Sequence, residues 1–365
     1  MDSRQKYNLM RYALRLARRG AGRVSPNPMV GAVVVKDGRI LGRGYHREFG
    51  GPHAEVVALE EAGKAARGAT LFVTLEPCCH YGKTPPCTDR IIAAGIKKVI
   101  VAMQDPNPQV NGQGLRILQE HGIDVESGIL EQAARELNAA FVKYIRERLP
   151  LVTLKIAQTL DGRVADARRR SQWISGELSR KRVHRWRSEA GAVLVGIGTV
   201  LEDDPSLTVR LVRGPQPWRI VLDSDLRIPL QARLLNDAYV EKTIIMTSRE
   251  ADPQKAAEIE KRGARLIRLN RHPNDGLPLR PVLQHLAEMN IAHVLVEGGS
   301  RIFSAFLQEK LADKLAVFIA PKLFGTGLHT LEFPGYSAER PLRLKQVRWR
   351  RVGEDVLLTA DLLWE

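Results

Sequence analysis

Apolar residues recur along the first 150 positions with periods that alternate between helix and strand. Residues 5–19 place apolar side chains at helical spacing. Residues 30–35 and 40–44 have the pattern of two strands, joined by a Lys-Asp-Gly turn at 36–38. The same reasoning predicts helices at 53–66, 87–94, 115–121 and 130–148, and strands at 70–75 and 98–103. Strands that alternate with helices predict βαβ units and a mostly parallel sheet.

A second α/β pattern follows the first. Pro150 ends the predicted helix 130–148, and a new strand begins at 152–156. Further strands are predicted at 192–195, 219–222, 243–246, 293–296 and near 315–320 and 355–361, with a helix at 302–309. We therefore expect two domains, residues 1–147 and 150–365, which agrees with a chain of 365 residues and about 150 residues per domain.

The charge balance is basic, and it admits two explanations. The chain has 56 Lys and Arg against 41 Asp and Glu. Such a balance indicates either an anionic partner or a solvated basic surface. The basic residues are spread out, and the densest cluster, Arg168–Arg170, is too short for a nucleic-acid-binding arm. No signal peptide and no apolar run of about 20 residues is present, so we expect a cytoplasmic protein without membrane contact.

The three cysteines predict a metal site. Cys78, Cys79 and Cys87 lie within ten residues, and an odd total with two adjacent members is a poor disulfide framework. His53 opens a predicted helix, Cys78 follows a strand, and Cys87 begins the next helix. One imidazole and two thiolates are a ligand set for one tetrahedral zinc ion with the fourth position left for water. A helix N-terminus also favours a thiolate.

Glu55 gives this site a candidate catalytic group. It stands two residues after His53, as does the glutamate that moves protons in zinc base deaminases. The alternative is a structural zinc with Cys79 or His80 as fourth ligand, which would leave Glu55 without a role. Cys78 and Cys87 are nine residues apart, whereas ordinary base deaminases have the spacing P-C-x-x-C. This spacing argues against cytidine and transfer-RNA adenosine deaminases.

Three segments closely resemble the bifunctional riboflavin-biosynthesis deaminase–reductase family. They are Pro-His-Ala-Glu at 52–55, Glu-Pro-Cys-Cys-His-Tyr-Gly-Lys-Thr-Pro-Pro-Cys at 76–87, and Gln-Asp-Pro-Asn-Pro at 104–108. The resemblance extends over essentially the whole chain. It implies an α/β protein with an N-terminal cytidine-deaminase-like α/β/α domain and a C-terminal dihydrofolate-reductase-like α/β domain. The family usually has serine at position 79, so Cys78 matches the zinc ligand.

The resemblance also implies substrate contacts in the first domain. These residues are Asn27, His46, Lys83, Asp105 and Asn107. An asparagine amide can pair with a pyrimidine edge as both donor and acceptor, and a lysine can meet a ribose phosphate. Without the resemblance, Asn27 would be interpreted as a turn residue and Lys83 as a solvated loop charge.

The second domain has weaker motifs of its own. Residues 296–300, Val-Glu-Gly-Gly-Ser, lead from a strand into a helix, and can be a phosphate site or a simple turn. Residues 196–198, Gly-Ile-Gly, begin a dinucleotide fingerprint, but Leu201 stands at its third glycine position. The resemblance favours a reductase that uses NADPH. It implies cofactor contacts at Ala157, Trp173, Thr199, Asp203, Gly299, Ser300, Arg301, Ile302 and Phe303. It implies substrate contacts at Ser171, Arg187, Leu207, Arg210 and Glu297. Lys155 is a further candidate for substrate binding, beside the reacting carbon together with Glu297.

The predicted function is therefore bifunctional. The first domain would deaminate 2,5-diamino-6-ribosylamino-4(3H)-pyrimidinone 5′-phosphate, and the second would reduce the ribosyl group to ribityl with NADPH. Arg187 and Arg210 would bind the phosphate, because guanidinium matches phosphate in a bidentate fork. The partners would be this small phosphorylated pyrimidine and further copies of the chain, but no nucleic acid. The rival readings are a nucleic-acid (tRNA) deaminase with a basic binding domain, and a zinc-stabilised module without turnover. Aromatic residues for base stacking make up only 5% of the chain, which disfavours the first rival.

Overall fold

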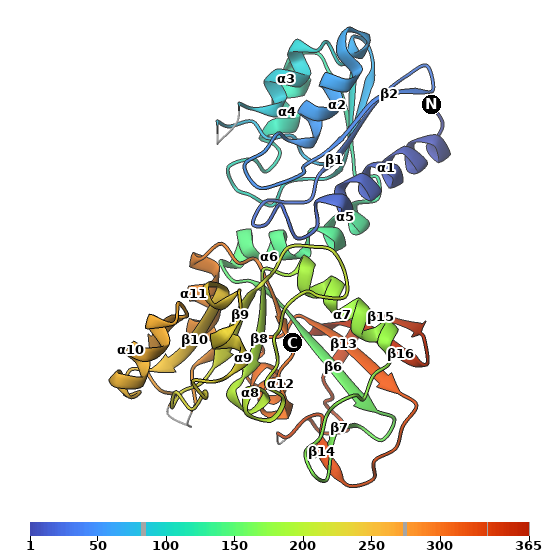
Figure 1. Cartoon of the computed structure of the whole chain (residues 1–365). Coiled ribbons are helices and arrows are strands. Elements are labelled where there is room, and N and C mark those ends of the chain that lie inside the picture. The colour runs from blue at the N-terminus through green and yellow to red at the C-terminus, as the bar shows by residue number, and fades with distance from the viewer. Residues whose placement is uncertain (82–84, 273–275, 334, 365) are drawn as a thin grey trace. The chain divides into compact units, whose positions relative to one another are not determined.

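The structure, a computed structural model, describes residues 1–81, 85–272, 276–333 and 335–364. It consists of two compact units, Met1–Arg148 and Leu149–Glu365 (Figure 1). Within the described residues, no helix has the length and apolar character needed to cross a membrane.

The first unit is built on a five-stranded sheet in the order β2-β1-β3-β4-β5. Its strands are β1 Gly31–Lys36, β2 Arg39–Tyr45, β3 Thr70–Leu75, β4 Lys98–Met103 and β5 Asp124–Ser127. β2, β3, β4 and β5 run in one direction, in agreement with the prediction of a mostly parallel sheet, and β1 alone is antiparallel to its neighbours β2 and β3. The reason is topological: the connection from β2 to β3 passes over β1, so that β3 pairs with a strand of opposite direction.

Helices surround this sheet. They are α1 Ser3–Ala17, α2 Ala54–Ala62, α3 Cys87–Ala93, α4 Gln113–Glu120, α5 Glu131–Leu137 and α6 Ala139–Glu147, with short 3₁₀ helices η1 Arg18–Gly20 and η2 Gly63–Ala66. The continuous helix predicted over 130–148 is interrupted at Asn138. This side chain is buried, and its amide accepts from Met29 N (2.8 Å) and donates to Met29 O (3.0 Å). The break thus ties the end of the unit to the loop before β1.

The second unit has a nine-stranded sheet in the order β11-β10-β9-β8-β12-β6-β13-β16-β15. Its strands are β6 Leu151–Thr159, β8 Ala192–Gly196, β9 Trp218–Leu222, β10 Thr243–Ser248, β11 Arg265–Leu269, β12 His293–Val296, β13 Lys314–Ala320, β15 Arg343–Val352 and β16 Asp355–Leu363. The first seven strands in this order are parallel, and the last two pairings are antiparallel. β7 Arg163–Asp166 and β14 Gly327–His329 form a separate ribbon.

The helices of this unit cover both faces of the sheet. They are α7 Glu177–Glu189, α8 Ile197–Asp203, α9 Arg233–Asn236, α10 Pro253–Lys261, α11 Leu279–Glu288 and α12 Ser300–Gln308, with the 3₁₀ turn η3 Val240–Lys242. Leu283 of α11 and Phe306 of α12 belong to one apolar core, and Val200 of α8 and Ile259 of α10 belong to another. The connection after β8 leads to β9, whereas the one after β12 leads in the opposite direction to β13. The carboxyl ends of β8 and β12 therefore form a topological switch point, where open α/β sheets bind ligands.

Candidate active sites

The predicted zinc ligands meet in the first unit. His53 immediately precedes α2, Cys87 is the first residue of α3, and Cys78 follows β3. Their ligand atoms lie within 4.8 Å of one another, and His53 Nδ1 is 3.2 Å from Cys87 Sγ and 3.5 Å from Cys78 Sγ. Zinc–ligand bonds of about 2.0–2.3 Å in a tetrahedron separate nitrogen from sulfur by about 3.5 Å. The residues present therefore fit a zinc ion.

This group contains three protein ligands and no fourth among the described residues. Cys79 and His80 are not part of it, and Cys79 Sγ instead lies 3.9 Å from Gln109 O. A hydrogen bond with Cys87 lowers the pKa of Cys78 to about 4, and the Cys78 sulfur in turn raises the pKa of Cys87. A bound cation favours both thiolates. A three-ligand set leaves one coordination position open, as in catalytic zinc sites.

Glu55 lies in the first turn of α2 and is 3% exposed. Burial raises the pKa of this carboxyl to about 7. α2 packs very closely on β2: a Cβ on Gly44 would lie 2.2 Å from Ala54 O, so only glycine allows this approach. The sheet thereby holds Glu55 next to His53. A carboxyl that titrates near neutral pH can both accept and return a proton.

Two predicted substrate residues lie beside the metal ligands. Asn27 Nδ2 is 3.3 Å from His46 Nε2, and the His46 ring is edge-on to the His53 ring with centroids 5.5 Å apart. His46 Nδ1 is 3.0 Å from the Pro52 carbonyl, which can only accept, so Nδ1 carries the proton and Nε2 accepts from Asn27. Burial lowers the pKa of His46, which keeps the ring neutral.

Asp105 and Asn107 follow β4 on the adjacent loop. Asp105 is 7% exposed, and burial raises its pKa to about 6. Its Oδ1 accepts from Asn107 N at 2.8 Å, and its own N–H donates to Glu76 Oε2 at 3.1 Å. In the sequence Glu76 stood out only as the first residue of the segment 76–87, and no pattern there predicted its hydrogen bond to Asp105. Lys83 lies outside the described residues.

The second unit brings three predicted substrate residues together. Arg187 on α7 donates to both carboxylate oxygens of Glu297, with Nε–Oε1 at 2.6 Å and Nη2–Oε2 at 2.9 Å. Lys155 on β6 lies 3.8 Å from the same carboxylate. Burial alone would raise the pKa of Glu297, but Arg187 lowers it to about 2. Burial lowers the pKa of Lys155. The two guanidinium donors of Arg187 that we expected to bind phosphate thus form hydrogen bonds with Glu297.

The irregular segment 204–210 carries the predicted residues Leu207 and Arg210. Its backbone is held by side chains: Thr208 O accepts from Arg187 Nη1 at 3.1 Å, and Arg210 N donates to His184 Nδ1 at 2.9 Å. Arg210 Nη1 also donates to Thr208 Oγ1 at 2.9 Å. Arg187 and the Arg210 guanidinium therefore both bind Thr208, which places Arg210 near the pair of Arg187 and Glu297.

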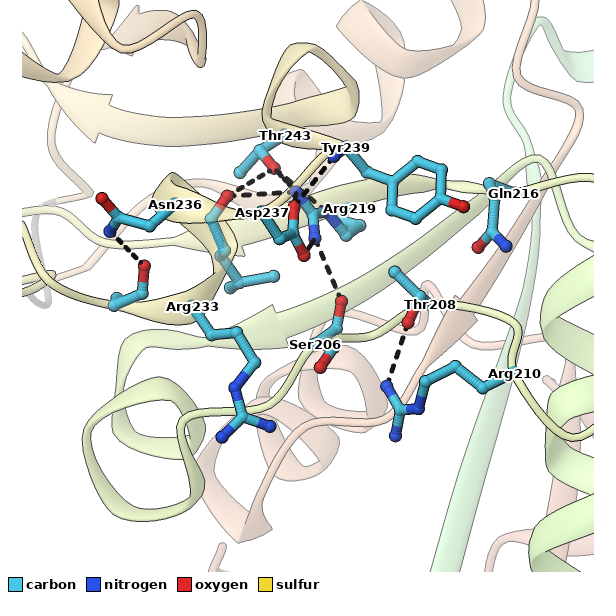
Figure 2. Close-up of polar contacts among 12 residues, drawn as sticks. Ser206, Thr208, Arg210, Gln216, Arg219, Arg233, Asn236, Asp237, Tyr239 and Thr243 are labelled. Atoms are coloured by element: carbon cyan, nitrogen blue, oxygen red, sulfur yellow. Dashed lines mark hydrogen bonds and ion pairs between the residues drawn. The ribbon is translucent and has the colours of Figure 1, made fainter.

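Two further residues support this segment, and sequence reasoning missed both; Figure 2 shows the contacts of one of them, Arg219. The Gln216 amide accepts from Val209 N at 2.7 Å and donates to Val209 O at 2.9 Å. Arg219, which is 1% exposed, donates to Ser206 O at 3.2 Å and forms a bidentate pair with Asp237 at 2.6 and 2.9 Å. These contacts span 7 to 18 residues of irregular chain, and no helix or strand period signals them.

The predicted cofactor residues gather at the switch point. Gly299 caps α12, and a Cβ on it would lie 4.0 Å from Thr199 Oγ1 of α8. Ser300 is 2% exposed, and within the described residues its Oγ has no hydrogen-bond partner. A Cβ on Gly196 would lie 2.7 Å from Ile302, so the two helices approach closely here. A buried hydroxyl without a partner beside the N-terminus of α12 fits a phosphate-bearing cofactor.

The remaining predicted residues of the second unit have varied surroundings. Ser171 Oγ donates to Asp203 Oδ1 at 2.8 Å, and Trp173 is 61% exposed with the Arg180 guanidinium 4.8 Å from its ring centroid. Ala157 lies on β6, and Arg301 is exposed. The Phe303 side chain is part of the apolar core, so only its backbone remains for a ligand.

Comparisons with known proteins identify the family. The family model "Cytidine and deoxycytidylate deaminase zinc-binding region" matches residues 3–103, and "RibD C-terminal domain" matches residues 150–358. The chain is 47% identical over 352 residues to riboflavin biosynthesis protein RibD of Aquifex aeolicus, which covers 96% of this chain and 97% of that protein. The chain belongs to the RibD family. It is also 42% identical over 369 residues to RibD of Escherichia coli, with coverages of 96% and 97%.

Solved structures agree with this assignment. RibD of Acinetobacter baumannii matches with a TM-score of 0.90 at 39% identity, covering 100% of both chains. A Thermotoga maritima protein, described as a diaminohydroxyphosphoribosylaminopyrimidine deaminase/5-amino-6-(5-phosphoribosylamino)uracil reductase, matches with a TM-score of 0.88 at 41% identity, covering 99% of both. The predicted fold class and the predicted bifunctional deaminase and reductase of riboflavin biosynthesis are confirmed. The site His53, Cys78 and Cys87 is the zinc-binding site of the deaminase, and the reductase implies a nicotinamide cofactor.

Proposed function

We propose that the first unit of this RibD-family chain deaminates 2,5-diamino-6-ribosylamino-4(3H)-pyrimidinone 5′-phosphate with one zinc ion. The second unit then reduces the ribosyl group of the product to ribityl with NADPH. The observation that carries the proposal is the placement of the buried Glu55 directly beside the group of His53, Cys78 and Cys87. The description of the similar Thermotoga maritima protein names the same two reactions.

The deaminase residues have separate tasks. When bound, zinc supplies a water whose pKa is near 7. Glu55 would accept a proton as a water oxygen bonds to the pyrimidine carbon, and would return it to the departing amine as the C–N bond breaks; its pKa of about 7 suits both transfers. The Asn27 amide pairs with the pyrimidine edge, and the carboxylate of Asp105 accepts from an amino group of the substrate. Burial of Glu55 and Asp105 keeps bulk water from competing for the bonds that these two carboxyl groups make.

The reductase residues bind and orient two phosphorylated ligands. When bound, NADPH supplies the hydride. Gly299, Ser300 and Thr199 are the residues that would hold its pyrophosphate, at the start of α12. Arg210 binds the substrate phosphate, since the fork of Arg187 is engaged by Glu297. Lys155 gives a proton to the ribose oxygen as the C1′–O bond breaks and the C1′–H bond forms, a role that its lowered pKa favours.

The proposal also includes a homo-oligomer formed by copies of this chain. β15 is the edge strand of the nine-stranded sheet, and all of its residues except Val352 are exposed. Trp349 on it is 60% exposed. An edge strand with an exposed aromatic side chain is a suitable surface for a second copy. Light scattering of the purified protein tests this assembly.

The test of the function is an assay that follows ammonia release and NADPH oxidation separately. Glu55→Gln should lower ammonia release at least about 100-fold while zinc content stays at one per chain. The same variant should oxidise NADPH normally when the deaminated intermediate is supplied. Glu60→Gln, an exposed residue of the same helix, is the matched control. Ammonia release at the wild-type rate from Glu55→Gln would contradict the assigned proton transfer.

A further inference from the structure

Glu76 is a buried carboxylate to which the reaction has so far given no role. It follows β3 directly, lies two residues before the zinc ligand Cys78, and is 3% exposed. Four backbone N–H groups donate to its two oxygens: Asp105 (3.1 Å) and Gly112 (2.9 Å) to Oε2, and Gly114 (3.0 Å) and Leu115 (3.4 Å) to Oε1. Each oxygen therefore has two donors, and among the residues that the structure describes no lysine or arginine forms an ion pair with this carboxylate.

These four donors come from two segments that carry none of the three zinc ligands. One is the loop after β4 that carries Asp105 and Asn107, and the other is the N-terminal turn of α4. Asp105 Oδ1 in turn holds Asn107 N at 2.8 Å. The turn of α4 packs so closely on the zinc loop that a Cβ on Gly114 would lie 2.2 Å from Pro77 O. The Glu76 carboxylate thus bonds the zinc loop to both the substrate loop and the start of α4.

We propose that Glu76 is a positioning residue of the deaminase, which fixes the loop of Asp105 and Asn107 at a set distance from Cys78. The inference rests on the proposed function, in which Asp105 contacts the pyrimidine. A carboxylate is needed because both of its oxygens must accept. An amide at this position has one acceptor oxygen and one NH₂ group, so either orientation places the NH₂ group against two N–H donors.

Glu76→Gln is the test, because it keeps the size of the side chain and removes one acceptor. The variant should keep one zinc per chain, since none of the three ligands is altered. Its KM for the diaminopyrimidine nucleotide and its Kd for the deaminated product should both rise roughly tenfold, the equivalent of one weakened substrate hydrogen bond. Its kcat should fall by a smaller factor, because the atoms around Glu55 stay in place.

Glu126→Gln is the matched control in the same unit. Glu126 binds Lys6 at 2.6 Å and Lys98 at 3.0 Å, away from the zinc ligands along β5. This variant also loses ion pairs, so it should unfold more easily, but its KM should remain that of the wild type. Glu76→Asp retains two acceptor oxygens on a shorter side chain and should recover part of the lost affinity. Reductase activity on supplied intermediate should be unchanged in all three variants.

Two results would overturn the inference. The first is a Glu76→Gln protein whose KM and product Kd equal those of the wild type. The second is loss of zinc from this variant with normal KM after zinc is restored, since Glu76 would then act through metal retention. A wild-type protein that releases no ammonia from the nucleotide refutes the proposed function instead, so the two failures are distinguishable.

Discussion

Replacing Arg187 by methionine should destabilise the second unit by leaving the Glu297 carboxylate without its main partner. Both side chains are buried, with exposed fractions of 12% and 6%, and they share two short hydrogen bonds. The only other cation bonded to this carboxylate within the described residues is Lys155, at 3.8 Å. Methionine fills a similar volume, so the change removes the charge and the donors with little loss of packing.

The size of the effect follows from the pKa of Glu297. A pKa of about 2 in place of 4.5 corresponds to about 3 kcal/mol of stabilisation at neutral pH. This agrees with the cost of about 3–5 kcal/mol for removing one partner of a buried ion pair. Because the pKa is lowered, the contribution is present above pH 4.5 and is lost as the pH falls from 4.5 toward 2. The double variant Arg187→Met/Glu297→Gln contains no unpaired carboxylate and should recover more than half of the loss.

Tryptophan fluorescence measures this unit alone. All five tryptophans lie between residues 173 and 364, so none is in the first unit. Urea unfolding followed by fluorescence should show a midpoint lowered by roughly 1 M in Arg187→Met. Arg185→Met, an exposed position on the same helix, is the control and should keep the wild-type midpoint. An unchanged midpoint in Arg187→Met, or a double variant as unstable as the single one, would refute the reasoning.

Two further predictions concern the segment 204–210. Gln216→Leu removes both bonds to Val209, each worth about 1 kcal/mol, so KM of the reductase should rise several-fold while KM of the deaminase stays constant in a kinetic assay of both reactions. The second prediction concerns pH. Burial, together with the nearby charge of Arg187, lowers the pKa of His184 from 6.5 to about 4. Between these pH values the unfolded chain binds more protons than the folded one, so the second unit should lose stability as the pH falls from 6.5 to 4. His184→Asn keeps an acceptor for Arg210 N and should flatten this dependence in fluorescence-followed urea unfolding; an unchanged slope would contradict the assignment.

Much of the fold could be predicted from local patterns. β3, β4 and β12 occur at the residues predicted for them, because buried strands have continuous apolar runs that can be recognised in the sequence. The strand order of the second sheet, with its switch point between β8 and β12, could not be predicted, and neither could the pairing of β1 with β3. Strand order depends on the direction that each connection takes across the sheet. The break at Asn138 was equally invisible, since it depends on the distant backbone of Met29.

The sequence by itself determined the chemistry of the zinc site. His53, Glu55, Cys78 and Cys87 occupy helix starts and a strand end, and these positions follow from neighbouring residues. The tertiary structure alone revealed the supports of both sites: Glu76 in the first unit, and Gln216 and Arg219 in the second. These side chains bind backbone groups from other parts of the chain. The Glu76 bonds reach 29 to 39 residues along the chain and form only when β3 and β4 lie side by side. Those of Gln216 and Arg219 to the segment 204–210 span 7 and 13 residues and depend on the irregular path of that loop, which no helix or strand period describes.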